Sequence, residues 1–308
     1  TLSSSSAASD VYKRQVVNKP KSAAYRAPGS PQAAFAAETV SDELARIHNM
    51  DPIDFRLQNA SKEDTRRADG VVFPKIGNVE VLEAAKASDH WKSDLGTPPK
   101  GRVRGRGVAS GYWFNVGLKS AVSLTVNNDG SVALVEGSTD IGGTRTSISM
   151  QAAEVLGIGV ENFIPSVGDT DTAGYADVTG GSRTTYATGF AAVKAAENLI
   201  EVLKERCSII WSLDKNDIDF EDGTFFATKD PELKFSFKEL ASNLDNTGGP
   251  ASSTGSVDLE SAGGAFGTHI VDVDVDPETG KTDIARYTVV QDVGTCLLYT
   301  SPSPRDRG

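Results

Sequence analysis

The stretch from Gly168 to Gly189 reads GDTDTAGYADVTGGSRTTYATG and lies between a predicted strand and a predicted helix. It is rich in glycine and hydroxyl side chains, holds few large aliphatic residues, and runs directly into a helical pattern. A loop that opens a helix offers unpaired backbone N–H groups and the positive end of the helix dipole. The stretch therefore predicts either a cradle for an anion such as phosphate or an ordinary polar loop that caps a helix.

A second polar loop of the same kind precedes this stretch. Residues 121–135 alternate around an Asn-Asp-Gly turn and predict a β-hairpin, whose second strand opens into GSTDIGGTR at residues 137–145. Residues 148–156 then predict a helix that Gly157 closes. Because each polar loop lies between a strand and a helix start, we expect the two loops to face one ligand together.

The helix that follows the quoted stretch is predicted to run from about residue 183 to residue 207, after a short strand at residues 163–167. Apolar side chains recur along it at spacings of three and four, which indicates one buried stripe. Cys207 belongs to this stripe, so we interpret it as a core residue rather than a nucleophile. The stripe consists of Val193, Ala196, Ile200, Leu203 and Cys207.

The remaining segments predict an α+β fold with mixed sheets, hairpins and packed helices. A helix is expected to begin at Ser30-Pro31 and a shorter one at Asp51-Pro52, where a capping side chain precedes a proline. Residues 269–290 alternate around a turn and predict a second hairpin with one apolar face. The basic run GRVRGRG at residues 101–107 is more typical of a solvated strand edge than of a binding patch.

Composition narrows the function classes. The chain has 308 residues, a net charge of -11 and a pI near 4.8, which argues against nucleic acid or an anionic membrane surface as a partner. Two cysteines and three scattered histidines give neither a disulfide scaffold nor a visible cluster of metal ligands. The sequence has no GxSxG elbow, P-loop or Rossmann glycine motif. These features are typical of a protein that holds a cofactor and lets the cofactor react.

The two ends of the chain differ in kind from its middle. SSAASDVYKRQ at residues 5–15 and CLLYTSPSPRD at residues 296–306 match in-frame translations of transposon-type sequencing adaptors. The alternative is a genuine disordered serine-rich head and proline-rich tail. We interpret residues 1–15 and 296–308 as adaptor-derived and leave them out of the fold reasoning.

Between these ends, ordered blocks of sequence resemble the molybdopterin-binding subunit of the xanthine dehydrogenase and aldehyde oxidase family. The blocks read YRAPGSPQAAFAAE from Tyr25, DELARIHNMDPIDFRLQN from Asp42, VNNDGSVALVEGSTDIGGTRTSISMQAAEVLGI from Val126, GDTDTAGYADVTGGSRTTYATGFAAVKAA from Gly168, and THIVDVDVDPETGKTDIARYTVVQDVG from Thr268. The resemblance implies an internal piece of a longer chain. Residues 16–75 would end a first molybdopterin-binding domain, residues 76–106 would form a linker, and residues 107–295 would form most of a second.

The resemblance also implies an activity. Such enzymes hydroxylate an aldehyde or an electron-poor heteroaromatic carbon with oxygen taken from water. They use molybdenum bound to molybdopterin, which in bacterial relatives often has the cytosine dinucleotide form, and pass electrons to 2Fe-2S clusters and FAD on partner domains or subunits. We therefore expect a cytoplasmic hetero-oligomer that acts on a small molecule, with neither nucleic acid nor a membrane as partner. The piece alone is expected to be inactive, because the family's glutamate base lies beyond it.

Site residues follow from the resemblance, position by position. Arg26 corresponds to a catalytic arginine that faces the substrate, and no residue is expected to bind the metal directly. Pro28, and Tyr112 or Trp113, would contact the substrate; Pro28 stands where purine oxidisers have an aromatic residue, which argues against a purine. Gly143 stands where some members have a glutamine. The cofactor-binding positions would be Ala27, Gly142, Gly143, Thr144, Thr179, Gly180, Gly181, Ser182, Arg183 and Thr184.

Two other hypotheses remain open from the sequence. A β-rich binding or structural module without redox function would also explain the hairpins, the acidity and the missing nucleophile. A homologue that binds the cofactor without catalysis would retain the two loops but lack a glutamate downstream.

Overall fold

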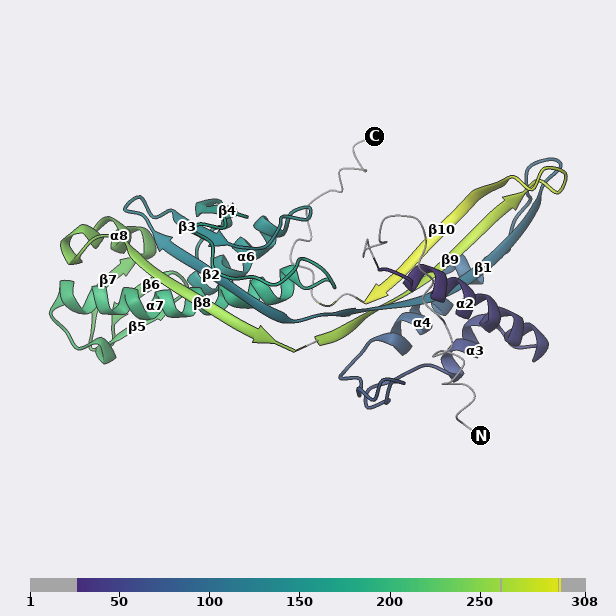
Figure 1. Cartoon of the computed structure of the whole chain (residues 1–308), viewed down its shortest axis with the longest axis horizontal. Helices are drawn as coiled ribbons and strands as arrows, with labels where there is room; N and C mark the ends of the chain where they lie inside the picture. Colours follow the sequence, from purple (N-terminus) through teal and green to yellow (C-terminus); the bar gives the residue numbers. More distant parts are fainter. Residues whose placement is uncertain (1–26, 261, 293, 295–308) are drawn as a thin grey trace, which may run out of the picture.

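The computed structural model describes residues 27–260, 262–292 and 294 of the chain (Figure 1). Arg26 and both adaptor-like ends lie outside the described residues. The described part combines helices with three separate sheets, which confirms the predicted α+β fold. Residues 76–106, predicted as a linker, hold two helices and the start of a strand.

The helices and strands divide into two lobes that lie side by side along the long axis of the molecule (Figure 1). We call them the ribbon lobe and the loop lobe. The ribbon lobe contains α2 (Ser30–Ile47), α3 (Pro52–Gln58), α4 (Asn78–Ala87), α5 (Asp89–Lys92), β1 (Val103–Asn115), β9 (Ala262–Val275) and β10 (Thr282–Asp292). The loop lobe contains β2 (Leu118–Val126), β3 (Val132–Glu136), α6 (Thr144–Leu156), η1 (Val160–Asn162), β4 (Phe163–Val167), η2 (Thr184–Thr188), α7 (Gly189–Trp211), η3 (Lys215–Asp217), β5 (Ile218–Glu221), β6 (Thr224–Ala227), β7 (Asp230–Ser236), α8 (Phe237–Ser242), η4 (Leu244–Thr247) and β8 (Ala251–Leu259).

One antiparallel ribbon runs through both lobes. Strand β1 continues almost directly into β2, and β8 continues into β9, so the same two chain segments pair on both sides of the junction (Figure 1). Asn115 pairs with Ala262 at one side of the junction and Leu118 pairs with Leu259 at the other, which preserves the register across it. Gly117 lies at this crossing, where an added Cβ would lie 2.0 Å from the Leu259 carbonyl oxygen. The backbones therefore touch at this point, and only glycine fits.

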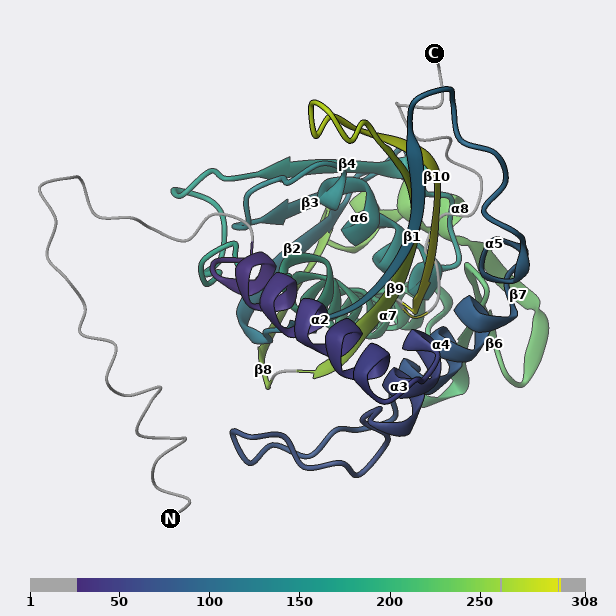
Figure 2. The same cartoon turned by 90° about the vertical axis from the view of Figure 1, so that its right-hand side faces the viewer.

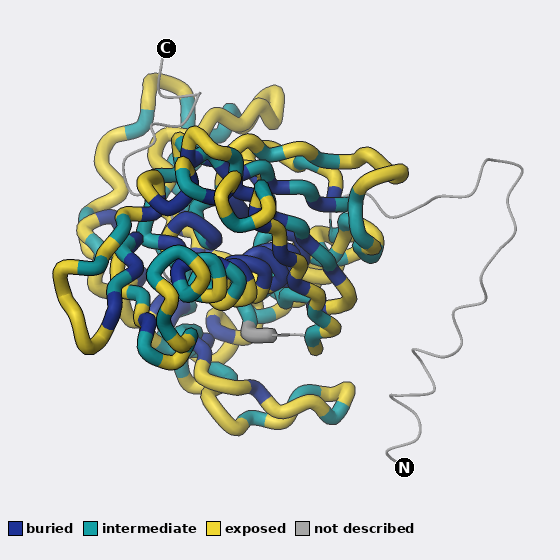
Figure 3. Tube along the Cα trace, turned by 90° about the vertical axis from the view of Figure 1, so that its left-hand side faces the viewer, coloured by how far each residue is buried: buried dark blue, intermediate teal, exposed yellow. Residues whose placement is uncertain are grey.

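An apolar core holds the loop lobe together. Its main sheet has the order β4-β3-β2-β8, with β3 and β4 parallel and the other pairs antiparallel. Helices α6 and α7 cover the sheet, and Figure 3 shows buried segments at the centre of this lobe. Helix α7 lies directly on β8, because an added Cβ at Gly255 would lie 2.3 Å from the Ala191 carbonyl oxygen. Cys207 is fully buried in the same core, where burial raises the pKa of its thiol to about 12, so the interpretation as a core residue is confirmed.

The ribbon lobe is organised differently. Helix α2 packs against β1, and α4 packs against β9 and β10 (Figure 2). Residues 269–290 form the predicted hairpin, but the buried face of β9 is not its valine face. The buried face carries Asp272 and Asp274 beside Phe266, Thr268 and Ile270, and each aspartate pairs with an arginine directly opposite on β1. The predicted apolar face is therefore wrong at this point.

We call these groups the Arg/Asp ladder. Arg106 binds both carboxylate oxygens of Asp272 at 2.7 and 2.9 Å, and Arg104 binds both of Asp274 at 2.7 and 2.8 Å. His90 of α5 extends the ladder, with its Nε2 atom 3.2 Å from Asp272 Oδ2. The basic run at residues 101–107 does lie on an edge strand, since β1 is an outer strand of the order β1-β9-β10, but two of its guanidinium groups pair with carboxylates of β9.

Candidate functional site

The two polar loops leave the main sheet from neighbouring parallel strands. Glycine loop 1 (residues 137–143) follows β3 and leads to α6, and glycine loop 2 (residues 178–183) lies between β4 and η2. Ligands of open sheets commonly bind where parallel strands end and helices begin. The loops also touch, because the Thr139 N–H donates to the Thr179 hydroxyl oxygen at 3.2 Å. The structure thus brings the two predicted loops together.

Glycine loop 1 presents an open backbone and a capped helix start. Gly142 and Gly143 have φ angles of 83° and 99°, and nothing lies within 4 Å of a Cβ built on either residue. Asp140 Oδ1 accepts from the N–H groups of Gly143 and Thr144 at 3.2 and 3.1 Å, and also from the Thr144 hydroxyl at 2.9 Å. The Arg145 guanidinium bonded to this carboxyl holds its pKa below the ordinary value. A carboxylate at the start of α6 suits an uncharged polar group better than a phosphate.

Glycine loop 2 is tightly folded on one side and open on the other. Gly181 has a φ of 68°, and its carbonyl oxygen accepts from the Val116 N–H at 2.9 Å. Ser182 also has a positive φ, 59°, a conformation that a residue with a Cβ seldom adopts. Gly180, in contrast, has nothing within 4 Å of an added Cβ. The hydroxyl oxygen of Thr184 is buried without a hydrogen-bond partner among the described residues.

Trp113 joins the second loop to the ribbon. Its indole Nε1–H donates to the Ser182 hydroxyl oxygen at 2.8 Å, and its ring stacks on Phe114 with centroids 5.0 Å apart. A residue expected at the substrate therefore contacts a residue expected at the cofactor. The Ser182 hydroxyl keeps its own hydrogen for another acceptor, since the indole only donates.

Tyr112 points elsewhere, because successive side chains of a strand face opposite sides. It packs against Phe73 and Phe266, with ring centroids 5.7 and 5.3 Å away. Of the two aromatic candidates, Trp113 is the one in contact with a glycine loop. Ala27 and Pro28 lie in the turn that opens α2, where the Ser30 N–H donates to the Ala27 carbonyl oxygen at 3.0 Å.

The expectation for Arg183 needs correction. Its side chain is fully buried and points into the lobe rather than toward a ligand. The guanidinium donates to the carbonyl oxygens of Gly117, Asp177 and Lys119 at 2.8, 3.0 and 2.6 Å, and to the Ser120 hydroxyl at 2.5 Å. Burial lowers the pKa of this group from its ordinary value. Arg183 fixes the loop to the ribbon crossing, and its side chain is not available to a phosphate.

The molybdopterin cofactor-binding domain model matches residues 80–297, and a second model with the same description matches residues 8–60. The chain belongs to the molybdopterin cofactor-binding domain family. The xanthine dehydrogenase molybdenum-binding subunit of Escherichia coli O157:H7 is 30% identical over 295 residues, which are 91% of this chain and 39% of that protein. The chain thus spans about two fifths of the length of this relative.

Solved structures show the same fold. Reconstituted CO dehydrogenase from Oligotropha carboxidovorans matches with a TM-score of 0.73 and 21% identity, over 86% of this chain and 37% of that one. Aldehyde oxidoreductase from Desulfovibrio desulfuricans matches with a TM-score of 0.69 and 25% identity, over 88% of this chain and 29% of that one. These likenesses agree with the α+β architecture of the chain.

The residues present fit such a cofactor. The open sides of Gly142, Gly143 and Gly180 leave room for close approach of a ligand to the backbone. Among the residues that the structure describes, nothing hydrogen-bonds the buried Thr184 hydroxyl, so a ligand could do so. No group of three or more histidine, cysteine or acidic residues in the described ranges is placed to hold a metal ion.

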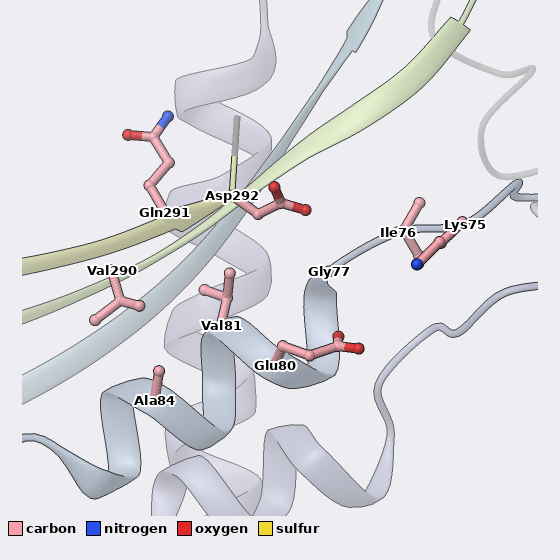
Figure 4. A pocket seen from close by; sticks show the side chains of 9 residues that line it. All are labelled: Lys75, Ile76, Gly77, Glu80, Val81, Ala84, Val290, Gln291 and Asp292. Atoms are coloured by element: carbon pink, nitrogen blue, oxygen red, sulfur yellow. The ribbon is translucent and has the colours of Figure 1, made fainter. Parts of the chain in front are cut away.

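A cavity of about 530 Å³ lies away from the glycine loops, between α4 and the end of β10 (Figure 4). Lys75, Glu80 and Asp292 are its charged residues, and Val81 and Val290 contribute apolar walls. None of its lining residues belongs to either glycine loop. The cavity is therefore separate from the candidate cofactor site.

Across the described ranges, none of the helices has the length and apolar character needed to cross a membrane.

Sequence reasoning missed three residues that shape the site: Asp140, Ser138 and Thr188. Asp140 could have been found, since an aspartate shortly before a helix start is a common cap. The two hydroxyl residues carry no comparable signal, because their importance depends on partners far away in the sequence.

Proposed function

We propose that the two glycine loops hold the molybdopterin cofactor, with glycine loop 2 at its phosphate and glycine loop 1 at its pterin. The contact between Thr139 and Thr179, which joins the loops, is the observation that carries this proposal. Loop 2 leads into a helical turn whose Thr184 hydroxyl has no partner within the described part of the chain, and the loop holds no carboxylate of its own, so it suits an anion. Loop 1 holds the Asp140 carboxylate, so it suits the uncharged ring system.

We further propose that the whole protein is a molybdenum hydroxylase. When bound, the molybdenum centre supplies the two-electron oxidation of an aldehyde or electron-poor heteroaromatic carbon. This chain supplies placement: the loops orient the cofactor, and Trp113 forms an aromatic wall beside it. Arg26 would stabilise negative charge that develops on the substrate, and Pro28 would adjoin it. The names of the relatives, which include a xanthine dehydrogenase and an aldehyde oxidoreductase, support this assignment.

Partners and location are part of the same proposal. The E. coli relative is named as a molybdenum-binding subunit, which supports assembly with other subunits. We propose that these carry 2Fe-2S clusters and FAD, that the assembly is cytoplasmic, and that the cofactor has the cytosine dinucleotide form. Co-purification, cell fractionation and release of the nucleotide by mild acid test these three points separately.

Matched glycine variants of the full-length parent test the cofactor site. Gly180→Leu places a side chain in the open space of loop 2, at a position without a left-handed backbone. Gly105→Leu does the same on β1, where nothing lies within 4 Å of an added Cβ either. We expect the first variant to lose molybdenum and pterin while the second retains both, as measured by elemental analysis and pterin fluorescence. If both variants retained molybdenum and pterin equally, loop 2 would not be part of the cofactor site.

Two measurements separate the competing functions. A full-length parent purified without molybdenum from a host that makes the cofactor would favour the non-redox binding module. A parent that carries molybdenum but oxidises no aldehyde or heteroaromatic compound would favour a homologue without catalysis. For the hydroxylase, Arg26→Ala is expected to lower turnover while molybdenum content stays unchanged.

A further inference from the structure

A chain of buried polar groups lies beneath the two glycine loops. It begins at Arg183, the last residue of loop 2, and ends at Glu136, next to loop 1. Three hydroxyl groups stand between them: Ser120 of β2, Thr188 at the end of η2, and Ser138 of loop 1. All five residues are at most 2% exposed, within a lobe whose core is mainly apolar.

The distances make this chain continuous. Arg183 Nη2 lies 2.5 Å from Ser120 Oγ, and Ser120 Oγ lies 2.9 Å from Thr188 Oγ1. Thr188 Oγ1 lies 2.8 Å from Ser138 Oγ. The Ser138 N–H donates to Glu136 Oε2 at 2.6 Å, which connects the last hydroxyl residue to the carboxyl.

Arg183 sets the direction of the hydrogen bonds. A guanidinium can only donate, so Ser120 accepts from it and has its single hydrogen left for Thr188. Thr188 can then donate to Ser138, whose backbone N–H binds the Glu136 carboxyl. Hydrogen bonds in such a chain polarise and strengthen one another.

We propose that this hydroxyl chain fixes the two glycine loops relative to each other and that Thr188 is its central positioning residue. The inference rests on the proposed function in one respect, because it assigns the loops to a single cofactor. The loops already touch on their outer side, where Thr139 meets Thr179. The chain forms the inner connection, which passes through β2 and η2. A ligand that bridges both loops then binds to a preformed geometry and does not have to order it.

Thr188→Val and Thr188→Ser form the test pair. Valine has the shape of threonine without the hydroxyl, so it interrupts the chain at its middle, whereas serine restores the hydroxyl. Hydrogen exchange of the 308-residue chain, without cofactor, is measured for peptides that cover loops 1 and 2. We expect Thr188→Val to accelerate exchange in both loops together and Thr188→Ser to restore it. Faster exchange in loop 2 alone, or in neither loop, would overturn the proposal.

A control separates this effect from general loosening. Ser149 of α6 is 2% exposed and its hydroxyl has no hydrogen-bond partner among the described residues. Ser149→Ala therefore removes a buried hydroxyl without interrupting the chain, and exchange in the loops is expected to stay unchanged. If Thr188→Val does not fold, Ser120→Ala interrupts the chain from β2 and must produce the same joint response. An acceleration confined to one loop in that variant counts against the proposal equally.

The full-length parent supplies a second readout. We expect Thr188→Val to lose molybdenum about tenfold faster on dilution than the wild type, an effect typical of residues that hold ligating groups from behind, and Thr188→Ser to lose it at the wild-type rate. If the wild-type parent contained no molybdenum, the proposed function would be wrong, but the coupled hydrogen exchange of the two loops would still stand as a separate result. Joint exchange without any change in molybdenum retention would show that the chain couples the loops but does not serve the cofactor, and would overturn that part of the inference.

Discussion

The two lobes share one ribbon but are stabilised by different interactions. In the loop lobe, fully buried apolar residues of β2, β3, α6 and α7 form the core, and its charged side chains lie mainly outside. In the ribbon lobe, the buried face of β9 carries Asp272 and Asp274, which pair with arginines of β1. Apolar packing tolerates small shifts, whereas an ion pair across two strands specifies which residues stand opposite each other. A slip of one residue would set an arginine against a valine.

The largest expected effect comes from removing one member of the Arg/Asp ladder. Asp272→Ala leaves Arg106 and His90 without their shared carboxylate in a buried position. Breaking a buried pair in this way typically costs about 3–5 kcal/mol. Urea unfolding should therefore show a large loss of stability. Asp283→Ala is the control, because that carboxylate is half exposed and pairs with Arg102 at the surface; a similar loss in both variants would contradict the special role of the ladder.

A smaller effect is expected from the close contact in the loop lobe. Gly255→Ala introduces a methyl group where α7 lies on β8, at a site where a Cβ would be 2.3 Å from a backbone oxygen. Overpacking of this kind costs about 1–3 kcal/mol. Thermal unfolding measures it, with Gly105→Ala as a control in open space. If the two variants unfold at the same temperature, the close contact between α7 and β8 at Gly255 does not contribute to stability.

The lobes should also respond to pH in opposite directions. The Arg106 guanidinium bonded to Asp272 lowers the pKa of that carboxyl, so its contribution is present above the unfolded value of about 3.9 and is lost as the pH falls through the folded value. Burial raises the pKa of the Glu136 carboxyl, although Arg183 opposes the shift. Its contribution is therefore complete below the unfolded value of about 4.3 and is lost as the pH rises through the folded value.

Urea unfolding over a pH series checks both signs. Relative to the wild type, Glu136→Gln should gain stability as the pH rises, since the amide stays neutral. Asp272→Asn should show its largest deficit at neutral pH and a shrinking deficit in acid. A Glu136→Gln difference that does not vary with pH would mean that the buried carboxyl does not titrate in this range.

The smallest effect is expected at the junction of the lobes. Trp113→Phe keeps an aromatic ring but removes the indole N–H that donates to Ser182. The net loss is about 0.5–1.5 kcal/mol, the usual value for one hydrogen bond. A double-mutant cycle with Ser182→Ala measures it, and additive effects would show that the two side chains are not coupled. Since Ser182 lies in loop 2, the same cycle also reports on the contact between ribbon and loop.

The strand–loop–helix order around both glycine loops was predictable from periodicity and from turn residues, because these signals are local. The inward direction of Arg183 was not, because a loop of glycine and hydroxyl residues is equally compatible with an arginine that faces an anion. Its carbonyl partners lie more than 60 residues away on the ribbon, apart from Asp177. The predicted helix from residue 183 begins instead with the π-helical turn η2, before α7 starts at Gly189.

The ribbon lobe shows a different limit of sequence reasoning. Alternation of valine and aspartate in β9 was correctly predicted as a strand, but alternation alone does not say which face is buried. The matching signal was the period-two run of arginines at residues 102–106, about 170 positions earlier. Two complementary charge patterns with the same period indicate pairing across strands. Helix α2 was also predicted, yet Phe35 and Ile47 on its apolar side are 78% and 71% exposed in the described chain.

The ribbon joins the lobes through two paired strands, with a register shift between Trp113 and Asn115 beside the junction. Two hydrogen-bonded strands bend and twist far more readily than they stretch, so relative motion of the lobes would take the form of rocking about the crossing near Gly117. Points close to a pivot move least. Loop 2 is fastened at that point, through Gly117 to Arg183 and through Val116 to Gly181. Loop 2 would therefore change its position little, even when the far ends of both lobes move relative to each other.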